Sequence, residues 1–197
     1  TIIGIDMSKN SPAVCIRKGE FLLFSSYLRA KNSGKIKKHY DELISNDVSM
    51  NFYQNFQPKN LEYSELEVWK SEDALLYSKH IVDSLPDADF IAIEGFSYGS
   101  KGNSAIDIIG YAYALRMKLI QRYGKEKIKI FSPGNIKKTA GKGNANKELM
   151  AEYFLNSTKF WQSIKEGNIE KTKKPCDDLI DSYYIQETLF HKIHKKV

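Results

Sequence analysis

The sequence predicts an α/β fold in which a mixed sheet of five strands carries helices on both faces. Three observations lead to this class. Short apolar runs separated by turns open the chain, strand-like and helix-like segments alternate in its second half, and 42% of the 197 residues are hydrophobic. Alternating segments form parallel connections with helices against a sheet, whereas closely spaced runs form an antiparallel meander. The length and hydrophobic content allow one domain with its own core, which argues against a disordered chain.

The opening segment contains three predicted strands. Thr1–Asp6 is an apolar run that ends in an acid, which is typical of a buried strand. Ala13–Arg17 and Phe21–Arg29 follow, and the short glycine-containing link between them favours a hairpin. Lys31–Lys70 is polar and has no steady period, so we interpret it as an insertion, with some helix, in a single domain that spans 1–197.

The remaining segments alternate between helix and strand. The expected elements are a helix at Ser71–Leu85 capped by Ser71, a strand at Phe90–Glu94, a helix at Ser104–Tyr123, a strand at Lys127–Phe131, a loop at Ser132–Asn146, a helix from Lys147 to Leu155 and a last helix at Asp177–His191. The helix at Ser104–Tyr123 carries an apolar stripe, formed by Ile106, Ile109, Tyr113, Met117 and Ile120.

Charge and cysteine content narrow the function classes. The formal net charge of +6 fits a nucleic-acid partner or simply a basic soluble surface. Cys15 and Cys176 lack metal-ligand spacing, which favours a reducing compartment. No apolar run approaches the roughly 20 residues that a membrane span needs, and no signal peptide is visible. We therefore expect a cytoplasmic protein without a membrane partner.

Two of the predicted buried strands end in an acidic residue, Asp6 and Glu94. A carboxylate at the end of an apolar strand lies at the rim of the sheet, where ligands bind in open α/β sheets. The alternative is an ordinary solvated strand end. A buried charge is rare unless it is paired or bound to a metal. The two acids are therefore stronger evidence for a metal site if further acids lie beside them.

The last helix begins with three acids, Asp177, Asp178 and Asp181. Asp178 and Asp181 are three residues apart, so that they project from one side of the helix. Interaction with the helix dipole explains Asp177 and Asp178 in the first turn, but it explains Asp181 less well. Carboxylates from two strands and one helix would suit Mg²⁺, which prefers oxygen ligands, and two such ions can stabilise both oxygens of a phosphodiester during hydrolysis.

Lysine and glycine are concentrated in the segment that precedes the helix at Lys147. The residues concerned are Lys137, Lys138, Lys142 and Lys147, with Gly134, Gly141 and Gly143. Glycine permits close approach of the backbone and lysine supplies charge to a phosphate, although a solvated basic loop is the alternative. Phe96 and Tyr98 follow Glu94 closely, and such aromatic rings stack on unpaired bases or pack in a core.

These patterns resemble the RuvC-type Holliday-junction resolvases of the RNase H-like superfamily. Asp6 in GID, Glu94 in AIEG and the pair Asp178-x-x-Asp181 resemble the family's four acids. The segment IEGFSYGSKGNSAIDIIGYAYALRM resembles the stretch from the second acid into the central helix, and SPGNIKKTAGKGNANKELM resembles the loop with two lysines that leaves a strand. The acids alone fit much of the superfamily, whereas the lysine loop indicates RuvC.

The resemblance implies an RNase H-like fold and a Mg²⁺-dependent endonuclease with two ions at its site, for which Mn²⁺ can substitute. Asp6, Glu94, Asp178 and Asp181 would bind the metal and activate water, and Lys147 would act near the scissile phosphate. The nucleic-acid contacts would come from Phe96, Tyr98, Lys137, Lys138, Lys142 and Lys147. The family dimerises through the helix that is here Ser104–Tyr123, which implies a homodimer on branched DNA such as a four-way junction.

The chain departs from the family pattern in two places. Asp6 and Glu94 are further apart than in bacterial members because of the segment 31–70, and the spacing from Lys137 to Lys147 is slightly shorter. These differences indicate a divergent branch, and the composition suits a phage or another mobile genome. Two alternatives stay open: an RNase H-like nuclease that acts on an RNA–DNA hybrid or RNA, and a nucleic-acid-binding module without catalysis.

Overall fold

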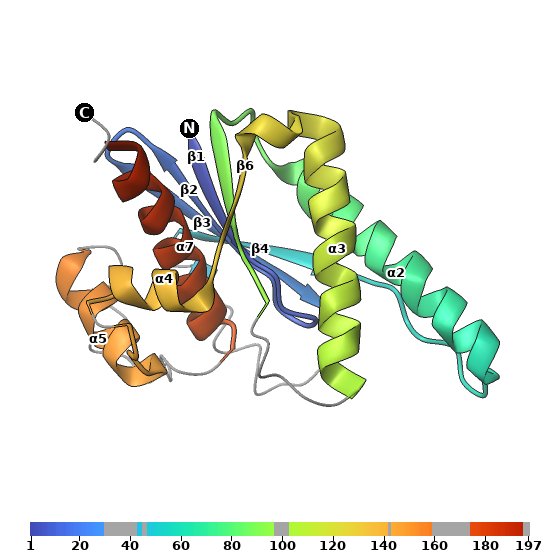
Figure 1. Ribbon diagram of the computed structural model, residues 1–197. Helices are drawn as coiled ribbons and strands as arrows, with labels where there is room; N and C mark the ends of the chain where they lie inside the picture. The colour runs from blue at the N-terminus through green and yellow to red at the C-terminus, as the bar shows by residue number, and fades with distance from the viewer. Residues whose placement is uncertain (30–42, 45–46, 97–102, 142, 159–173, 195–197) are drawn as a thin grey trace.

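The computed structural model describes residues 1–29, 43–44, 47–96, 103–141, 143–158 and 174–194 (Figure 1). These residues form a sheet with strand order β4-β3-β2-β1-β5-β6. Its strands are β1 (Ile2–Asp6), β2 (Ala13–Lys18), β3 (Phe21–Arg29), β4 (Val48–Tyr53), β5 (Phe90–Glu94) and β6 (Ile128–Phe131). The helices are α2 (Tyr63–Ser84), α3 (Asn103–Tyr123), α4 (Pro133–Thr139), α5 (Lys147–Ser157) and α7 (Cys176–His194), with a 3₁₀ turn at Lys125–Lys127.

The sheet combines an antiparallel meander with parallel crossovers, as predicted. β1 pairs with β2, and β2 with β3, in antiparallel orientation, whereas β5 pairs in parallel with β1 and β6 with β5. The predicted number of five strands is wrong, because a sixth strand, β4, pairs in parallel with β3. β4 belongs to the segment that we expected to be an insertion with some helix. The strand is only six residues long and lies within a polar segment, so the alternation of Val48, Met50 and Phe52 with polar residues is a weak strand signal.

Helices cover both faces of the sheet, which confirms the predicted α/β class. α2 and α3 lie on one face, and α4, α5 and α7 lie on the other (Figure 1). The side chains of β1 and β2 alternate between the two cores that result. Ile3 and Ile5 belong to the core under α2 and α3, whereas Cys15 belongs to the core under α5 and α7.

The close packing of α7 on β1 depends on Gly4. A Cβ atom at this position would lie 2.5 Å from the backbone nitrogen of Gln186, and closer still to the carbonyl oxygen of Ser182. Both obstacles are backbone atoms of α7, so a side chain on residue 4 would push the helix away from the strand. The missing side chain thus lets the first turns of α7 approach the end of β1.

The start of α2 differs from the prediction. The helix begins at Tyr63 rather than at Ser71, because Glu62 and Glu65 form a capping box at its first turn. Serine is a common helix cap, and Ser71 was therefore a misleading signal. Its hydroxyl instead donates to the carbonyl oxygen of Glu67, one turn earlier in the same helix.

The predicted loop at Ser132–Asn146 contains a short helix, α4. Ser132 caps it by accepting a hydrogen bond from the Asn135 backbone N–H, and Pro133 occupies the first turn, where its missing N–H costs nothing. The glycines, lysines and asparagines of this segment favour a loop, although Pro133 is compatible with a helix start. This prediction is therefore wrong for Pro133–Thr139.

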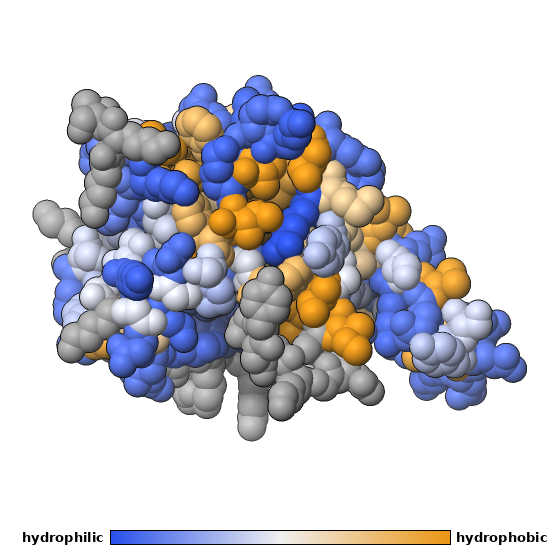
Figure 2. Space-filling model, viewed as in Figure 1, coloured by the Kyte–Doolittle hydropathy of each residue, from blue (hydrophilic) through white to orange (hydrophobic). Residues whose placement is uncertain are grey.

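α3 has almost the predicted bounds, but its apolar stripe faces away from the sheet. The core side of the helix consists instead of Tyr111, Ala112, Leu115 and Leu119. The side chains of the stripe are exposed, with relative exposures of 68% for Ile106, 38% for Ile109, 54% for Tyr113, 57% for Met117 and 45% for Ile120. Figure 2 shows apolar side chains on the outer surface along α3. None of the described helices is both long and apolar enough to cross a bilayer.

Candidate metal centre

The predicted acids meet at one edge of the sheet. β1 and β5 are parallel neighbours with Ile5 opposite Ile93, so Asp6 and Glu94, the last residues of these strands, lie at the same edge. α7 begins beside them and brings Asp178 and Asp181. Asp6 and Asp178 are almost fully buried, at 8% and 4% exposure. The sequence prediction that two strands and the last helix share a site agrees with this arrangement.

Burial raises the pKa of all four carboxyl groups, and repulsion by neighbouring acids adds to it for Asp6, Asp178 and Asp181. Burial is the largest cause for Asp6, whose pKa lies well above its ordinary value, and the charges of Asp178, Asp181 and Glu94 add to it. Burial, then Glu94 and Asp178, raise the pKa of Asp181 to about 7. Burial also raises the pKa of Glu94 and of Asp178. A cation at this edge would reduce the repulsion between the carboxylates and would stabilise their charged forms against the effect of burial.

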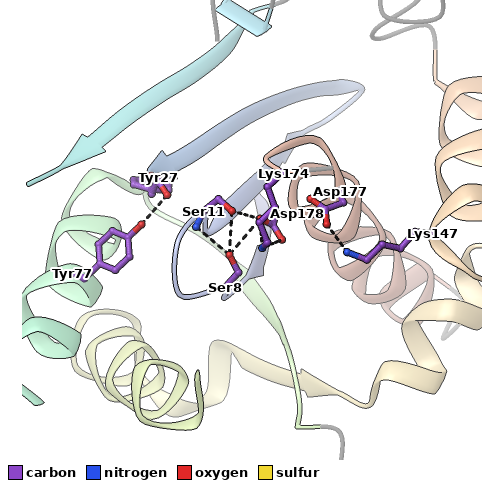
Figure 3. Close-up of polar contacts among 8 residues, drawn as sticks. All are labelled: Ser8, Ser11, Tyr27, Tyr77, Lys147, Lys174, Asp177 and Asp178. Carbon is purple, nitrogen blue, oxygen red and sulfur yellow. Dashed lines mark hydrogen bonds and ion pairs between the residues drawn. The ribbon is translucent and has the colours of Figure 1, made fainter. Parts of the chain in front are cut away.

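Asp178 has three hydrogen-bond donors around it (Figure 3). Its Oδ2 accepts from the hydroxyls of Ser11 and Ser8, the latter at 3.3 Å. The Lys174 Nζ lies 2.8 Å from both Oδ1 and Oδ2. Sequence analysis missed these three donors. Lys174 precedes Asp178 by four residues, just before α7, and the serines follow Asp6 in the chain, so this closeness in sequence was the available signal.

Lys147, predicted to act near the phosphate, forms an ion pair with Asp177 on the other side of the α7 start (Figure 3). Burial lowers the pKa of Lys147, but the hydrogen bond and charge of Asp177 outweigh it, so that the net shift is upward. Asp177 is 6% exposed, and its Oδ1 has no partner among the described residues. The interaction with the helix dipole that we predicted for Asp177 therefore does not describe its main contact. Asp177 holds the Lys147 ammonium.

A pocket of about 410 Å³ opens beside the acids. Its lining includes Glu94 and Asp181 from the acid cluster together with Lys137 and Lys147. Lys137 extends from α4, and its charge counteracts the rise in the pKa of Glu94. Carboxylates and lysines that line one pocket could bind a metal and a phosphate next to each other.

Among the described residues, the others that we predicted to contact nucleic acid do not line this pocket. Lys138 is exposed on α4 and is absent from the pocket lining. Phe96 is partly buried, with its ring centroid 4.3 Å from the Arg116 guanidinium and 5.4 Å from the Tyr113 ring. Arg116 also donates to the Glu94 carbonyl oxygen at 3.2 Å, which ties the end of β5 to α3. Tyr98 and Lys142 lie outside the described residues.

The donor chemistry of the cluster fits Mg²⁺, but the carboxylates do not form a closed cage. In the described part of the chain, no three acid, histidine or cysteine side chains are arranged to hold a metal ion as they stand. Mg²⁺ keeps several waters and needs only one or two carboxylates, so a closed cage is unnecessary. The ion pair with Lys174 also fixes Asp178 in its present orientation. We conclude that the residues suit the ion once these side chains adjust.

Two solved structures are similar to this chain. Thermus thermophilus RuvC in complex with a Holliday junction substrate matches with a TM-score of 0.50 and 15% identity, over 99% of this chain and 95% of that one. The chain has the RuvC fold. Thermus thermophilus RuvC also matches in a second structure, with a TM-score of 0.48 and 14% identity, over 98% of this chain and 96% of that one. No protein-family model and no curated protein matches the sequence.

Proposed function

We propose that the chain is a Mg²⁺-dependent endonuclease that hydrolyses phosphodiesters in branched DNA, with the four-way junction as its substrate. The observation that carries this proposal is the crowding of four buried or partly buried carboxyl groups beside a lysine-lined pocket. Acids that raise one another's pKa destabilise the fold when they are ionised. A divalent cation at a reaction site would offset this repulsion and explains why the acids lie together. The RuvC fold supports the choice of junction DNA, since a solved RuvC is bound to that substrate.

In this proposal, Asp6, Glu94, Asp178 and Asp181 hold the metal. Two Mg²⁺ ions, or Mn²⁺ in their place, would stabilise negative charge on the attacking and leaving oxygens. Asp177 holds the Lys147 ammonium at the rim of the same pocket, where it would offset charge on the phosphate.

The DNA backbone would be bound by the lysines of α4 and the following segment. Lys137 lines the pocket, and Lys138 is exposed on the same helix. Lys142 stays a candidate for the same role from its sequence alone. Phe96 and Tyr98 remain our candidates for stacking on junction bases. To stack on a base, the Phe96 ring would have to leave its contact with Arg116, or keep that contact while it also contacts the base.

The proposal includes a homodimer formed through α3. Five apolar side chains in a row along an exposed helix favour a buried interface, because such patches are rare on free surfaces. A two-fold dimer would present two metal centres to a symmetric junction. Met117→Glu should convert the dimer to a monomer in light-scattering measurements, whereas Phe21→Glu, which changes an exposed apolar residue on β3, should leave it intact. A monomeric unchanged protein would contradict this part.

The decisive experiment offers a labelled four-way junction, a matched linear duplex and an RNA–DNA hybrid to the protein, with Mg²⁺ or with EDTA. We expect paired nicks in the junction that EDTA abolishes. Equal cutting of hybrid or duplex would keep the metal centre but replace the substrate. Binding to the junction without any nicking in Mg²⁺ or Mn²⁺ would favour a non-catalytic binding module.

A further inference from the structure

Lys174 occupies a special position at the metal centre. Its Nζ is 2.8 Å from Oδ1 and 2.8 Å from Oδ2 of Asp178, so that it faces both oxygens equally. The lysine side chain is 50% exposed, whereas that of Asp178 is 5% exposed. The charge of Lys174 also acts on Asp6, where it opposes the rise in pKa caused by burial and by the other acids. A single flexible cation thus compensates two of the acids that we assign to the metal.

The two oxygens of Asp178 differ in their other partners. Oδ2 is also held by the hydroxyls of Ser8 and Ser11, which come from the turn after β1. Oδ1 has no hydrogen-bond donor other than Lys174 among the residues that the structure describes. If the lysine moved away, the serines would keep the carboxylate oriented and Oδ1 would become free for another cation.

Departure of the lysine would cost little. Half of its side chain already lies in water, and an ion pair with one exposed partner is weak because water competes for the ammonium group. A divalent cation interacts with the same carboxylates more strongly than a single ammonium does. The ammonium and the metal cannot share the position between the two Asp178 oxygens.

We propose that Lys174 is a tethered counterion that occupies Asp178 in the metal-free protein and is displaced when the divalent cation binds. This inference rests on the metal centre of the proposed function, but not on its substrate. Two opposite effects follow. Lys174 stabilises the metal-free fold by offsetting repulsion among the acids, and it weakens metal binding by competition. Lys174 is therefore a positioning residue that acts through Asp178.

The test compares Lys174→Gln with Lys79→Gln in the full chain without DNA. Lys79 is a matched control, because it also pairs with an aspartate one helical turn away, Asp83, but on the surface of α2. Titration calorimetry with Mn²⁺ should give a dissociation constant about two- to fivefold lower for Lys174→Gln than for the unchanged protein, and no change for Lys79→Gln. The melting temperature of metal-free Lys174→Gln should be lower, and saturating Mn²⁺ should close most of that gap.

A lysine that merely supported the site would give the opposite sign, since its removal would weaken Mn²⁺ binding. Equal or weaker binding by Lys174→Gln therefore overturns the inference and leaves the metal centre intact, whereas absence of Mn²⁺ binding in both proteins overturns the metal centre as well. A second measurement needs no variant. Acetylation of Lys174 in the unchanged protein, followed by mass spectrometry, should become faster when Mn²⁺ is added, while that of Lys79 stays constant. An unchanged rate at Lys174 contradicts the displacement.

Discussion

One cluster of buried polar groups contains the four acids at the edge of the sheet, and another, on the side covered by α2 and α3, is built around the single acid Asp73. The acids of the two clusters are compensated in different ways. Asp73, on α2, is fully buried, yet its partners are complete. It accepts hydrogen bonds from Arg29 at 2.6 Å, from Asn55 at 2.7 Å and from the Tyr111 hydroxyl. Burial acts to raise the pKa of Asp73, but the hydrogen bonds and the Arg29 charge outweigh it, so the net shift is downward.

At the metal centre, burial and repulsion outweigh the compensating partners of the acids. The pKa of Asp6 and of Asp181 is raised, first because the carboxyl groups are buried and then because each lies near other carboxyl groups. A fully paired buried acid holds elements together, as Asp73 does for β3, α2 and α3. Acids that repel one another reduce stability unless something external binds to them. This contrast supports our proposal that the Asp73 cluster serves the fold and the cluster of four acids serves chemistry.

The largest expected effect is on activity. Asp6→Asn should reduce junction cleavage by about 10³-fold, because it removes a metal ligand that contributes several kcal/mol to stabilisation of the transition state. The metal-free variant should be at least as stable as the unchanged protein, since one repelling charge is gone. Asp87→Asn, an exposed acid before β5, is the control and should cleave normally. Cleavage by Asp6→Asn within tenfold of normal would remove Asp6 from the site.

The same substitution in the other cluster should act on stability. Asp73→Asn leaves the partly buried Arg29 without its carboxylate and should lower the free energy of unfolding by about 3–5 kcal/mol. Urea denaturation measures this loss. The variant should still cleave at conditions where it is folded, with a far smaller loss than Asp6→Asn. An Asp73→Asn protein with an unchanged free energy of unfolding would contradict the distinction between the two clusters.

Gly4→Ala tests whether α7 must lie against β1 to bring the acids together. The added methyl group meets backbone atoms of Ser182 and Gln186. We expect a loss of about 1–3 kcal/mol in unfolding free energy from overpacking, together with weaker Mn²⁺ binding, because Asp178 and Asp181 move with the helix. Gly134→Ala, where a Cβ atom would meet no neighbour, is the control. Unchanged stability of Gly4→Ala would show that α7 is not constrained as described.

A further effect concerns the dependence of stability on pH. The folded pKa of Asp181, about 7, lies above its ordinary value of 3.8. The folded state therefore binds more protons between these values, and its stability falls as pH rises through this range. The stability of Asp181→Asn relative to the unchanged metal-free protein should thus increase from pH 4 to pH 7 and then level off. A constant difference across that window in urea titrations would contradict the assignment.

The sequence predicted the parts of the fold that have strong local signals. Apolar runs ending in acids located β1 and β5, and the spacing of Asp178 and Asp181 placed both on one helix. β4 escaped prediction because it is short and lies within a polar segment, and only its pairing with β3 shows it to be a strand. The exposure of the α3 stripe could not be foreseen, since an apolar stripe at helical spacing fits a core or an interface equally well.

The candidate site was predictable as a set of acids but not as a network. The four acids and Lys147 were all predicted from their residue types, order and family resemblance, and the structure brings the acids to one edge of the sheet. Their partners depend on three-dimensional contacts between distant segments, as for Ser11 with Asp178 and Lys147 with Asp177. The pairing of Asp73 with Arg29 was invisible for the same reason.

The most direct test of the central claim is to locate the cation itself. Crystals grown with Mn²⁺ and measured for anomalous scattering should show the ion against Asp6 and at least one of Glu94, Asp178 and Asp181, with no ion near Asp73. Absence of Mn²⁺ from these four carboxylates at saturating concentration, or its binding elsewhere alone, would contradict the assignment of this cluster as the metal centre.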